Sequence, residues 1–263
     1  MRPTLLLLPL LVSSLLQFPD HASADCEPAA CGNLTLSYPF WLGSSTNPPS
    51  SPCGHPGFEV WCSDGGRDEA SLKGSSIHVL SIDYTNNSFV ASHSRVAGDD
   101  GVCKTDFNMS SSIALSLQFT FSPQNRALCF LYHCSNGTAP PSGPEYANAT
   151  SNCSAPIYAY LDRPPEIATG GCTYAYMPVL GSEAAVMTAA NYSRLLKDGF
   201  VLDWEVASVG DCRTCKASGG QCRYDNDTAE FWCLCPDGRR AGSTCPGLHV
   251  LRGVTYPHRP VII

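Results

Sequence analysis

Short runs in which apolar and polar residues alternate recur along the chain, and they predict β-strands rather than long helices. The clearest run covers residues 113–121, where every second side chain is apolar and the others are small or polar. That period of two is typical of a strand with one buried and one exposed face. Residues 123–125 favour a turn, and residues 127–134 form the next apolar run. We therefore expect these two runs to pair as a β-hairpin.

The same pattern predicts strands elsewhere. Residues 34–38 alternate, residues 77–84 and 89–91 flank a turn of Thr, Asn and Ser, and residues 172–179 and 200–206 are rich in aromatic and β-branched side chains.

One helix is expected in this otherwise β-rich chain. Ser182 and Glu183 can cap a stretch rich in Ala, Leu and Met that continues to about Leu196, and Gly199 can end it. The predicted fold class is therefore all-β, with one short helix.

The first 24 residues are predicted to be a secretory signal peptide rather than part of the fold. The basic Arg2 precedes an apolar run over residues 5–16, and residues 22–24 form a small-residue cleavage site. Pro9 and two serines interrupt the run, which is too short to span an apolar bilayer core of about 30 Å. We expect the chain to be secreted.

Cysteine usage predicts a disulfide-rich protein. All 15 cysteines follow the predicted signal peptide, and an oxidising compartment favours bridges over free thiols. Because 15 is odd, at most seven intramolecular bridges can form. Zinc binding is the alternative explanation for paired cysteines, and a secreted chain makes it the weaker one. The pattern alone leaves the connectivity open.

Asparagine usage independently favours secretion. Eight of the eleven asparagines lie in N-x-Ser/Thr sequons, far more than chance placement would give, so we expect a glycosylated surface. The predicted acceptors are Asn33, Asn86, Asn108, Asn136, Asn148, Asn152, Asn191 and Asn226.

The stretch from Cys26 to Cys62 carries the most specific motif. It reads C-x4-CG-x-L-x-L-x-YPFW, followed by CG-x3-F-x3-C. This combination of four cysteines, two glycines and an aromatic cluster resembles the N-terminal module of plant wall-associated receptor kinases, which is known as the galacturonan-binding domain.

The C-terminal part carries a second motif. Cysteines from Cys212 to Cys245 follow the spacing C-x2-C-x6-C-x10-C-x-C-x9-C, which resembles the end of an epidermal-growth-factor-like fold. Together with the preceding strand it is similar to the C-terminal cysteine-rich module of the same receptor kinases. In that family a transmembrane helix and a kinase normally follow. Neither is recognisable in the residues after Cys245, so we expect no kinase activity from this chain.

These resemblances imply two extracellular modules and a set of bridged cysteines. The expected organisation is a signal peptide at 1–24, a galacturonan-binding-like module at 25–134, a glycosylated linker at 135–149, a cysteine-rich module at 150–245 and a short tail at 246–263. The family pattern has no counterpart of Cys129, which is therefore the expected free thiol. The expected bridged residues are Cys26, Cys31, Cys53, Cys62, Cys103, Cys134, Cys153, Cys172, Cys212, Cys215, Cys222, Cys233, Cys235 and Cys245.

The resemblance implies an acidic pectin ligand, which basic side chains would bind. The cations of the N-terminal module are Arg67, Lys73, Arg95, Lys104 and Arg126. They form no run, so an ordinary solvated surface is the competing explanation. Trp41 is the tryptophan expected to be exposed for stacking on sugars, whereas Trp61 and Trp232 each precede a cysteine and are expected to pack over disulfides. No cofactor is expected, apart from calcium as a bridge between carboxylates of protein and pectin.

Other functions are less well supported. A net charge of −7 without a clustered basic surface argues against nucleic-acid binding. No G-x-S-x-G, HExxH, P-loop or kinase catalytic motif occurs, so we expect no enzyme. The alternatives are a protein-interaction module, acting as a soluble decoy or co-receptor for receptor-kinase ectodomains at the plasma membrane, and a truncated version of a full serine/threonine receptor kinase.

Overall fold

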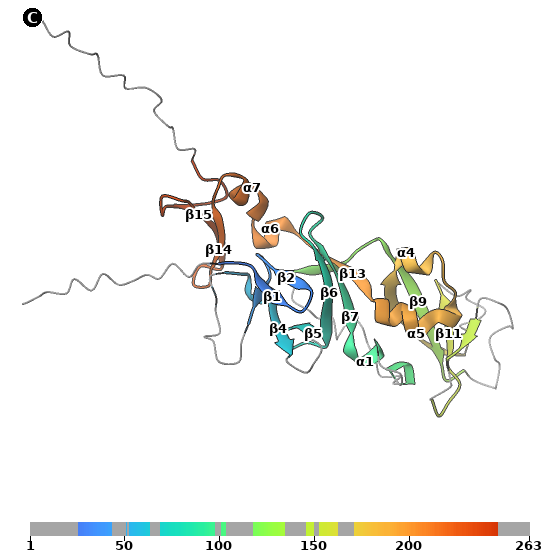
Figure 1. Cartoon of the computed structure of the whole chain (residues 1–263). Coiled ribbons are helices and arrows are strands. Elements are labelled where there is room, and N and C mark those ends of the chain that lie inside the picture. Colours follow the sequence, from blue (N-terminus) through green and yellow to red (C-terminus); the bar gives the residue numbers. More distant parts are fainter. Residues whose placement is uncertain are drawn as a thin grey trace, which may run out of the picture.

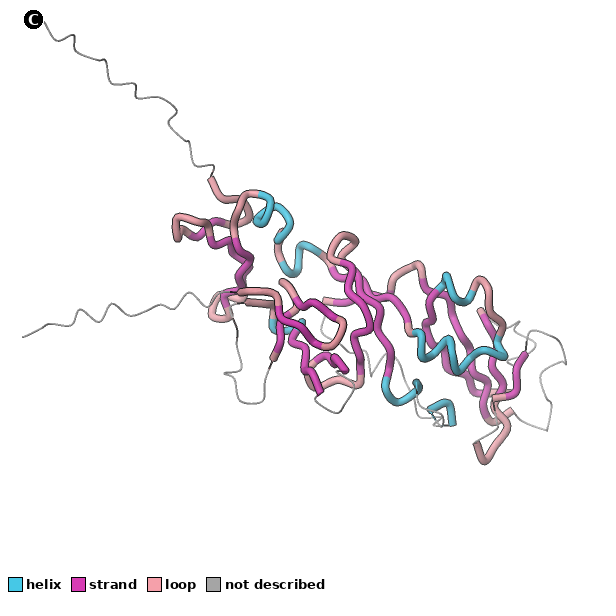
Figure 2. Tube along the Cα trace, in the orientation of Figure 1, coloured by secondary structure: helices cyan, strands magenta, loops and turns pink. Residues whose placement is uncertain are grey.

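The computed structural model shows four β-sheets joined by short helices. It describes residues 26–43, 51, 53–63, 69–97, 101–103, 118–134, 146–149, 153–162 and 171–246. A seven-stranded sheet occupies the middle of the molecule, with a four-stranded sheet on one side and a three-stranded sheet on the other (Figure 1). Strands dominate the trace, and the helices are short (Figure 2). The all-β, disulfide-rich fold class is confirmed.

The central sheet has the strand order β3-β4-β5-β6-β7-β13-β8. Its strands are β3 (Trp41–Leu42), β4 (Glu59–Ser63), β5 (Glu69–Leu72), β6 (Ile77–Asp83), β7 (Ser88–His93), β13 (Phe200–Trp204) and β8 (Phe119–Phe121). All neighbours are antiparallel except β3 and β4. The hairpin of β6 and β7 confirms the predicted strand–turn–strand.

Short elements surround this sheet. They are the hairpin of β1 (Ala29–Cys31) and β2 (Leu34–Leu36), the 3-10 turns η1 (Pro56–Phe58) and η2 (Gly101–Cys103), and α1 (Ser94–Ala97). No helix in the described part of the chain is long and apolar enough to cross a membrane.

The four-stranded sheet has the order β10-β11-β9-β12. Its strands are β10 (Tyr146–Asn148), β11 (Tyr158–Leu161), β9 (Asn125–Tyr132) and β12 (Thr173–Leu180). One face is covered by α4 (Gly181–Ala184), η4 (Ala189–Asn191) and α5 (Tyr192–Asp198) (Figure 1). Tyr192 of α5 packs edge-on against Phe130, with ring centroids 6.0 Å apart. Strand β12 confirms the strand predicted at 172–179.

The expected hairpin between residues 113–121 and 127–134 is wrong for the part that is described. β8 pairs with β13 in the central sheet, whereas β9 lies between β11 and β12 in the four-stranded sheet. The Asn125 side chain explains the divergence: it accepts from Val201 N at 2.8 Å and donates to Val201 O at 2.7 Å. These bonds tie the start of β9 to β13 instead of turning the chain back along β8.

The expected helix from Ser182 to about Leu196 is also wrong in its extent, because it is broken into α4, η4 and α5. Asn191 accepts a hydrogen bond from Thr188 N at 3.2 Å, and the two residues form a capping box. Capping side chains compete with the helical backbone and start a new helix there. Gly199 ends α5 with a φ of 87°, as predicted.

The linker prediction fails for residues 146–148, which form β10 and pair with β11. The predicted signal peptide, the rest of that linker up to residue 145 and the tail beyond residue 246 lie outside the described residues.

Seven disulfides link fourteen cysteines, and Cys129 is free and buried. The bridges are Cys26–Cys53, Cys31–Cys62, Cys103–Cys153, Cys134–Cys172, Cys212–Cys222, Cys215–Cys233 and Cys235–Cys245. Cys103–Cys153 joins the segment after β7 to the segment before β11. The modules expected from the sequence are therefore linked covalently as well as by shared sheets.

Two buried histidines make stability depend on pH. His93 is 1% exposed, and burial, followed by the Arg95 charge, lowers its pKa from 6.5 to about 4. Burial also lowers the pKa of His55, whose Nδ1 accepts from Gly57 N at 3.1 Å. Between pH 6.5 and 4 the unfolded chain therefore binds protons that the folded chain does not, and stability is lost as the pH falls through this window.

We expect the melting temperature to be lower at pH 4.5 than at pH 7.5, and His93→Asn to reduce this difference. Thermal unfolding at a series of pH values measures it. A melting temperature that is constant between these pH values in the unmodified protein would contradict the expectation.

Candidate functional site

A cleft of about 660 Å³ lies where the central sheet meets the C-terminal cysteine-rich segment. Its volume falls within the range of small-ligand sites, about 300–1,000 Å³. It is lined by three stretches that are distant in the sequence: Tyr38, Pro39, Tyr84, Thr85, Asn87, Trp204, Val206, Val209, Gly210, Asp211, Cys212, Arg213, Thr214 and Lys216. Two of its sides come from different predicted modules, so the cleft exists only when both are folded together.

One wall of the cleft is aromatic and rigidly held. The Tyr84 hydroxyl donates to Thr35 O at 2.9 Å and accepts from Ser37 N at 2.8 Å. Burial raises the Tyr84 pKa to about 12, so the phenol stays neutral. Trp204, at the end of β13, is only 5% exposed, and therefore the half-buried Tyr84 ring offers more surface to a ligand.

The back of the cleft is closed by a contact between the two modules. The Tyr38 hydroxyl donates to Val209 O at the end of α6 (Val206–Val209), and its ring lies 5.4 Å from that of Phe231. Gly210 follows with a φ of 84°, and a Cβ there would lie 2.1 Å from Phe231 Cγ. The chain can make this turn only with glycine.

The opposite wall is α7 (Cys212–Ala217), which carries the charged groups. Arg213 and Lys216 are exposed, and an Arg213 Nη2 hydrogen bond to Thr85 O holds the guanidinium across the cleft. Asp211 caps α7 by accepting from Thr214 N at 2.9 Å. The Thr214 side chain and backbone lower the Asp211 pKa, so this carboxylate is charged at neutral pH. The cleft thus combines two cations with one carboxylate that is already engaged.

The three-stranded sheet anchors α7. Its strands are β14 (Gln221–Asp225), β15 (Glu230–Leu234) and β16 (Arg240–Ala241), and two disulfides from α7 end on β14 and β15. Arg213 and Lys216 are therefore presented from a helix with covalent attachments at both of its cysteines.

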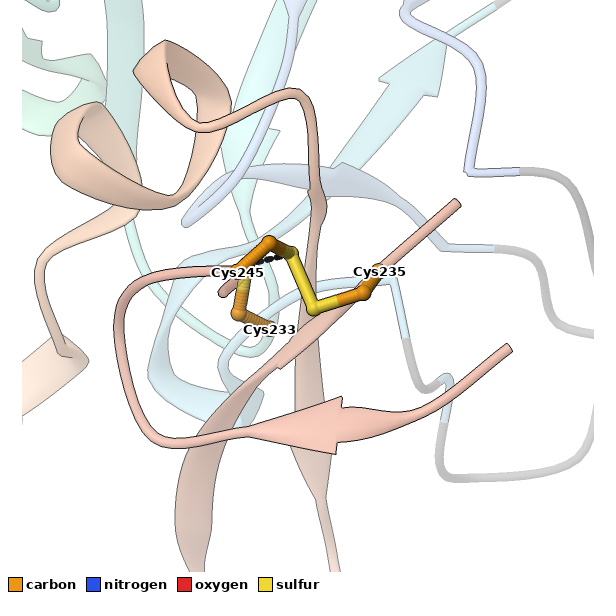
Figure 3. Close-up of side chains that lie close together, drawn as sticks. All are labelled: Cys233, Cys235 and Cys245. Atoms are coloured by element: carbon orange, nitrogen blue, oxygen red, sulfur yellow. Dashed lines mark hydrogen bonds between the residues drawn. A yellow bond between two sulfur atoms is a disulfide. The ribbon is translucent and has the colours of Figure 1, made fainter. Parts of the chain in front are cut away.

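Within the described ranges, the only three metal-type ligands that come together are Cys233, Cys235 and Cys245 (Figure 3). Cys235 is bonded to Cys245, and Cys233 to Cys215, with 3.7 Å between the sulfurs of Cys233 and Cys245. Metal binding needs thiolates, and bridged sulfurs are not thiolates. The group is a pair of stacked disulfides.

The exposure expected for two of the three tryptophans is reversed. Trp41 is 7% exposed and its indole donates to His55 O at 3.0 Å, so the expected exposure is wrong. Trp61, expected to be packed in the core, is 41% exposed because β4 turns its side chain to solvent. Trp232 is half-buried, and the Arg240 guanidinium lies 4.3 Å from its ring centroid.

The expected basic residues do not gather at the cleft. Lys73 is 2.8 Å from the buried Glu59, which also accepts from Trp61 Nε1. Arg126 forms a bidentate pair with Asp162 beside the four-stranded sheet. Arg95 is exposed on α1.

Arg67 and Lys104 lie outside the described residues. Of the three expected cations that the structure describes, Lys73 and Arg126 already have carboxylate partners, so their charge is largely neutralised.

Sequence reasoning missed Arg213 and Lys216 because it searched for cations only in the N-terminal module. A usable signal was present: Arg213 and Lys216 each directly follow a bridged cysteine, Cys212 and Cys215, and all four residues lie on the short helix α7.

Two family models match the chain in this order. Residues 26–93 match "Wall-associated receptor kinase galacturonan-binding", and residues 134–238 match "Wall-associated receptor kinase C-terminal". The cleft draws Tyr38 and Tyr84 from the first region and Trp204 and α7 from the second.

Similar curated proteins are receptor-like kinases of Arabidopsis thaliana. The LEAF RUST 10 disease-resistance locus receptor-like protein kinase-like 1.2 is 30% identical over 86% of this chain and 34% of its own length. The kinase-like 1.4 protein is 26% identical over 78% of this chain and 29% of its own length. The chain thus spans about a third of the length of these relatives, and no solved structure matches it. With both modules matched in the same order, the chain belongs to the wall-associated receptor kinase family and carries its galacturonan-binding and C-terminal modules.

Proposed function

We propose that this chain is a secreted, non-enzymatic binding protein for acidic cell-wall pectin, and that the cleft between its two modules is the binding site. The match to the galacturonan-binding family over residues 26–93 supports the ligand class. The observation that carries the site is the position of Arg213 and Lys216 on α7, across the cleft from Tyr84.

The chemistry of the cleft suits a galacturonate unit. A guanidinium can bind a carboxylate through two parallel hydrogen bonds, and an ammonium adds a point charge. The Tyr84 ring can pack against the apolar C–H face of the sugar, while Thr85 and Asn87 offer polar partners to its hydroxyls.

Affinity for a single unit is expected to be weak. Exposed ion pairs contribute about 0–1 kcal/mol each, so two of them with one stacked ring favour a site of roughly millimolar strength. Repeated engagement along a polymer can raise apparent affinity by about 10²-fold or more. A short oligogalacturonide should therefore bind far less well than the polymer.

Retention on immobilised de-esterified pectin across a NaCl series tests this proposal. Arg213→Glu and Lys216→Glu should each elute at lower salt, with apparent affinity reduced up to about tenfold. Arg194→Glu is the matched control, since Arg194 is an exposed cation on α5, away from the cleft, and should elute as the unmodified protein does.

The remaining outcomes separate the alternatives. If retention is lowered by Arg95→Glu, Arg67→Glu or Lys104→Glu instead, the binding site lies at the cations expected from the sequence. Loss of retention on calcium removal would indicate a calcium bridge. No retention under any condition would favour the protein-interaction alternative, which a pull-down of receptor-kinase ectodomains addresses.

Secretion and glycosylation belong to the same proposal. The sequon asparagines within the described ranges are all exposed, which supports their use as acceptors: Asn33, Asn86, Asn148, Asn191 and Asn226.

We also expect no phosphoryl transfer from ATP by the purified chain, and radiolabelled ATP with a generic protein substrate measures this.

A further inference from the structure

The four-stranded sheet has a face lined with tyrosines. Phe130 of β9 points toward α5, so its neighbours Cys129 and Leu131 point to the opposite face. Residues directly paired across strands share a face, and the register therefore places on that opposite face Tyr146 of β10, Tyr158 and Tyr160 of β11, and Tyr174 and Tyr176 of β12.

The sequon residue Asn148 belongs to the same face. It follows Tyr146 by two positions in β10, which keeps both side chains on one side of the strand. It pairs directly with Tyr158, and the rings of Tyr146 and Tyr160 beside it lie 4.8 Å apart. Asn148 is exposed at the edge of the sheet. The Asn148 backbone lies about one strand spacing, roughly 4.8 Å, from the Tyr158 backbone, so a sugar attached to its side chain starts beside the Tyr158 ring on the same face.

This placement sets Asn148 apart from the other described sequons. Asn86 and Asn226 also follow a tyrosine by two positions, but both lie in turns. Moreover, Tyr84 is held by the backbone of residues 35 and 37, and Tyr224 is 7% exposed and packs on His55. Among the described acceptors, Asn148 alone lies within a strand.

Tyrosine is well suited to hold a tethered sugar. The face of its ring is electron-rich and attracts the C–H groups of a pyranose, while its hydroxyl can bond to sugar hydroxyls or to the N-acetyl group. Because the glycan is covalently attached, its contact with the sheet is intramolecular and needs little intrinsic affinity.

We propose that the N-linked glycan of Asn148 packs on this tyrosine face, with its first N-acetylglucosamine against Tyr146, Tyr158 and Tyr160. The glycan then acts as a covering layer of the four-stranded sheet, opposite to α5. This inference rests on the proposed glycosylation but not on pectin binding, and its readouts do not involve pectin retention.

The first test uses Thr150→Ala, which removes the sequon and keeps Asn148. The full chain is secreted from a eukaryotic host, and glycopeptide mass spectrometry measures occupancy at residue 148. Hydroxyl-radical footprinting should then show Tyr158 and Tyr160 oxidised several-fold more slowly in the occupied protein than in Thr150→Ala. Trp61, exposed on the central sheet, is the internal reference and should react equally in both.

The second test measures stability. We expect Thr150→Ala to melt about 2–4 °C below the occupied protein. Enzymatic trimming of the glycan to its first N-acetylglucosamine should preserve most of this difference, and Tyr158→Ala should abolish most of it. Asn33→Gln, which removes a sequon from a turn without a facing tyrosine, should change neither the footprint of Tyr158 nor the melting temperature by a comparable amount.

Three results would overturn the proposal: an unoccupied Asn148, equal oxidation of Tyr158 and Tyr160 with and without the glycan, or a stability difference that persists unchanged in Tyr158→Ala. If Tyr158 and Tyr160 of the Thr150→Ala protein are protected from oxidation only after pectin is added, the tyrosine face binds the polysaccharide rather than the Asn148 glycan.

Discussion

Replacing Gly220 with alanine is expected to prevent the C-terminal segment from closing its disulfides. A Cβ at this position would lie 2.4 Å from Cys233 Sγ, 2.8 Å from Cys245 Sγ and 3.0 Å from Cys215 Sγ. Contacts this short with bridged sulfurs cannot relax as a flexible side chain could, because each sulfur is held from both sides. Losing a native bridge from a small disulfide-rich segment costs about 2–5 kcal/mol and often abolishes folding.

The measurement is the amount of secreted protein and its free-thiol content. We expect little Gly220→Ala protein in the medium, and several free thiols in any that is secreted. Gly242→Ala is the matched control, because its Cβ would meet nothing within 4 Å. Normal secretion of Gly220→Ala with all bridges formed would show that the sulfur pair can move aside.

Phe40→Ala is expected to be the most damaging change in the aromatic cluster that packs on the central sheet. Phe40 is 1% exposed and makes edge-to-face contacts with four rings at centroid distances of 5.0–6.3 Å: Phe58, Tyr84, Phe89 and Trp204. Truncating a buried phenylalanine to alanine costs about 3–5 kcal/mol, since the cavity adds to the lost transfer energy.

For a chain of this length, that loss lowers the melting temperature by at least about 6 °C. Phe40→Leu should lose less because it fills more of the cavity. Phe121→Ala, at a position 44% exposed on β8, should change the melting temperature little. If Phe40→Ala had the same melting temperature as Phe121→Ala, the ring cluster would not be what stabilises the fold.

Phe40→Ala is expected to affect the cleft as well as the melting temperature, because Tyr84 and Trp204, which pack on Phe40, also line the cleft. We therefore expect Phe40→Ala to weaken pectin retention as well, in proportion to how far the aromatic wall shifts.

Local periodicity predicted which residues form strands but not which strands pair. The alternation in residues 77–84 and 172–179 follows directly from one buried face, and β6 and β12 lie there. Pairing depends on contacts between distant residues, such as the Asn125 side chain with Val201, which no short window contains. For that reason the hairpin expected between β8 and β9 was the natural but wrong choice.

Short sequence patterns could not predict which tryptophans are exposed either. Trp41 precedes a polar loop yet is buried, because its indole finds the carbonyl of His55. Trp61 precedes a bridged cysteine yet is exposed, because neighbours in a strand point to opposite faces. Position relative to a cysteine says little about which face a side chain takes.

The cleft could be predicted only in part. The aromatic motif around Tyr38 indicated a ligand-binding module, but the cations that complete the cleft come from α7, far along the chain. Only the folded arrangement brings Tyr84 and Arg213 together, through the Arg213 hydrogen bond to the backbone of Thr85.

The position of β13 between β7 and β8 also affects how the protein is made. Leu202 pairs with Phe89 on one side and Phe121 on the other, so the central sheet cannot be completed until the ribosome has released residue 204. Until then β7 presents an unpaired edge on which another chain could add a strand. We therefore expect the growing chain to be most prone to aggregation while the residues between β7 and β13 are being synthesised.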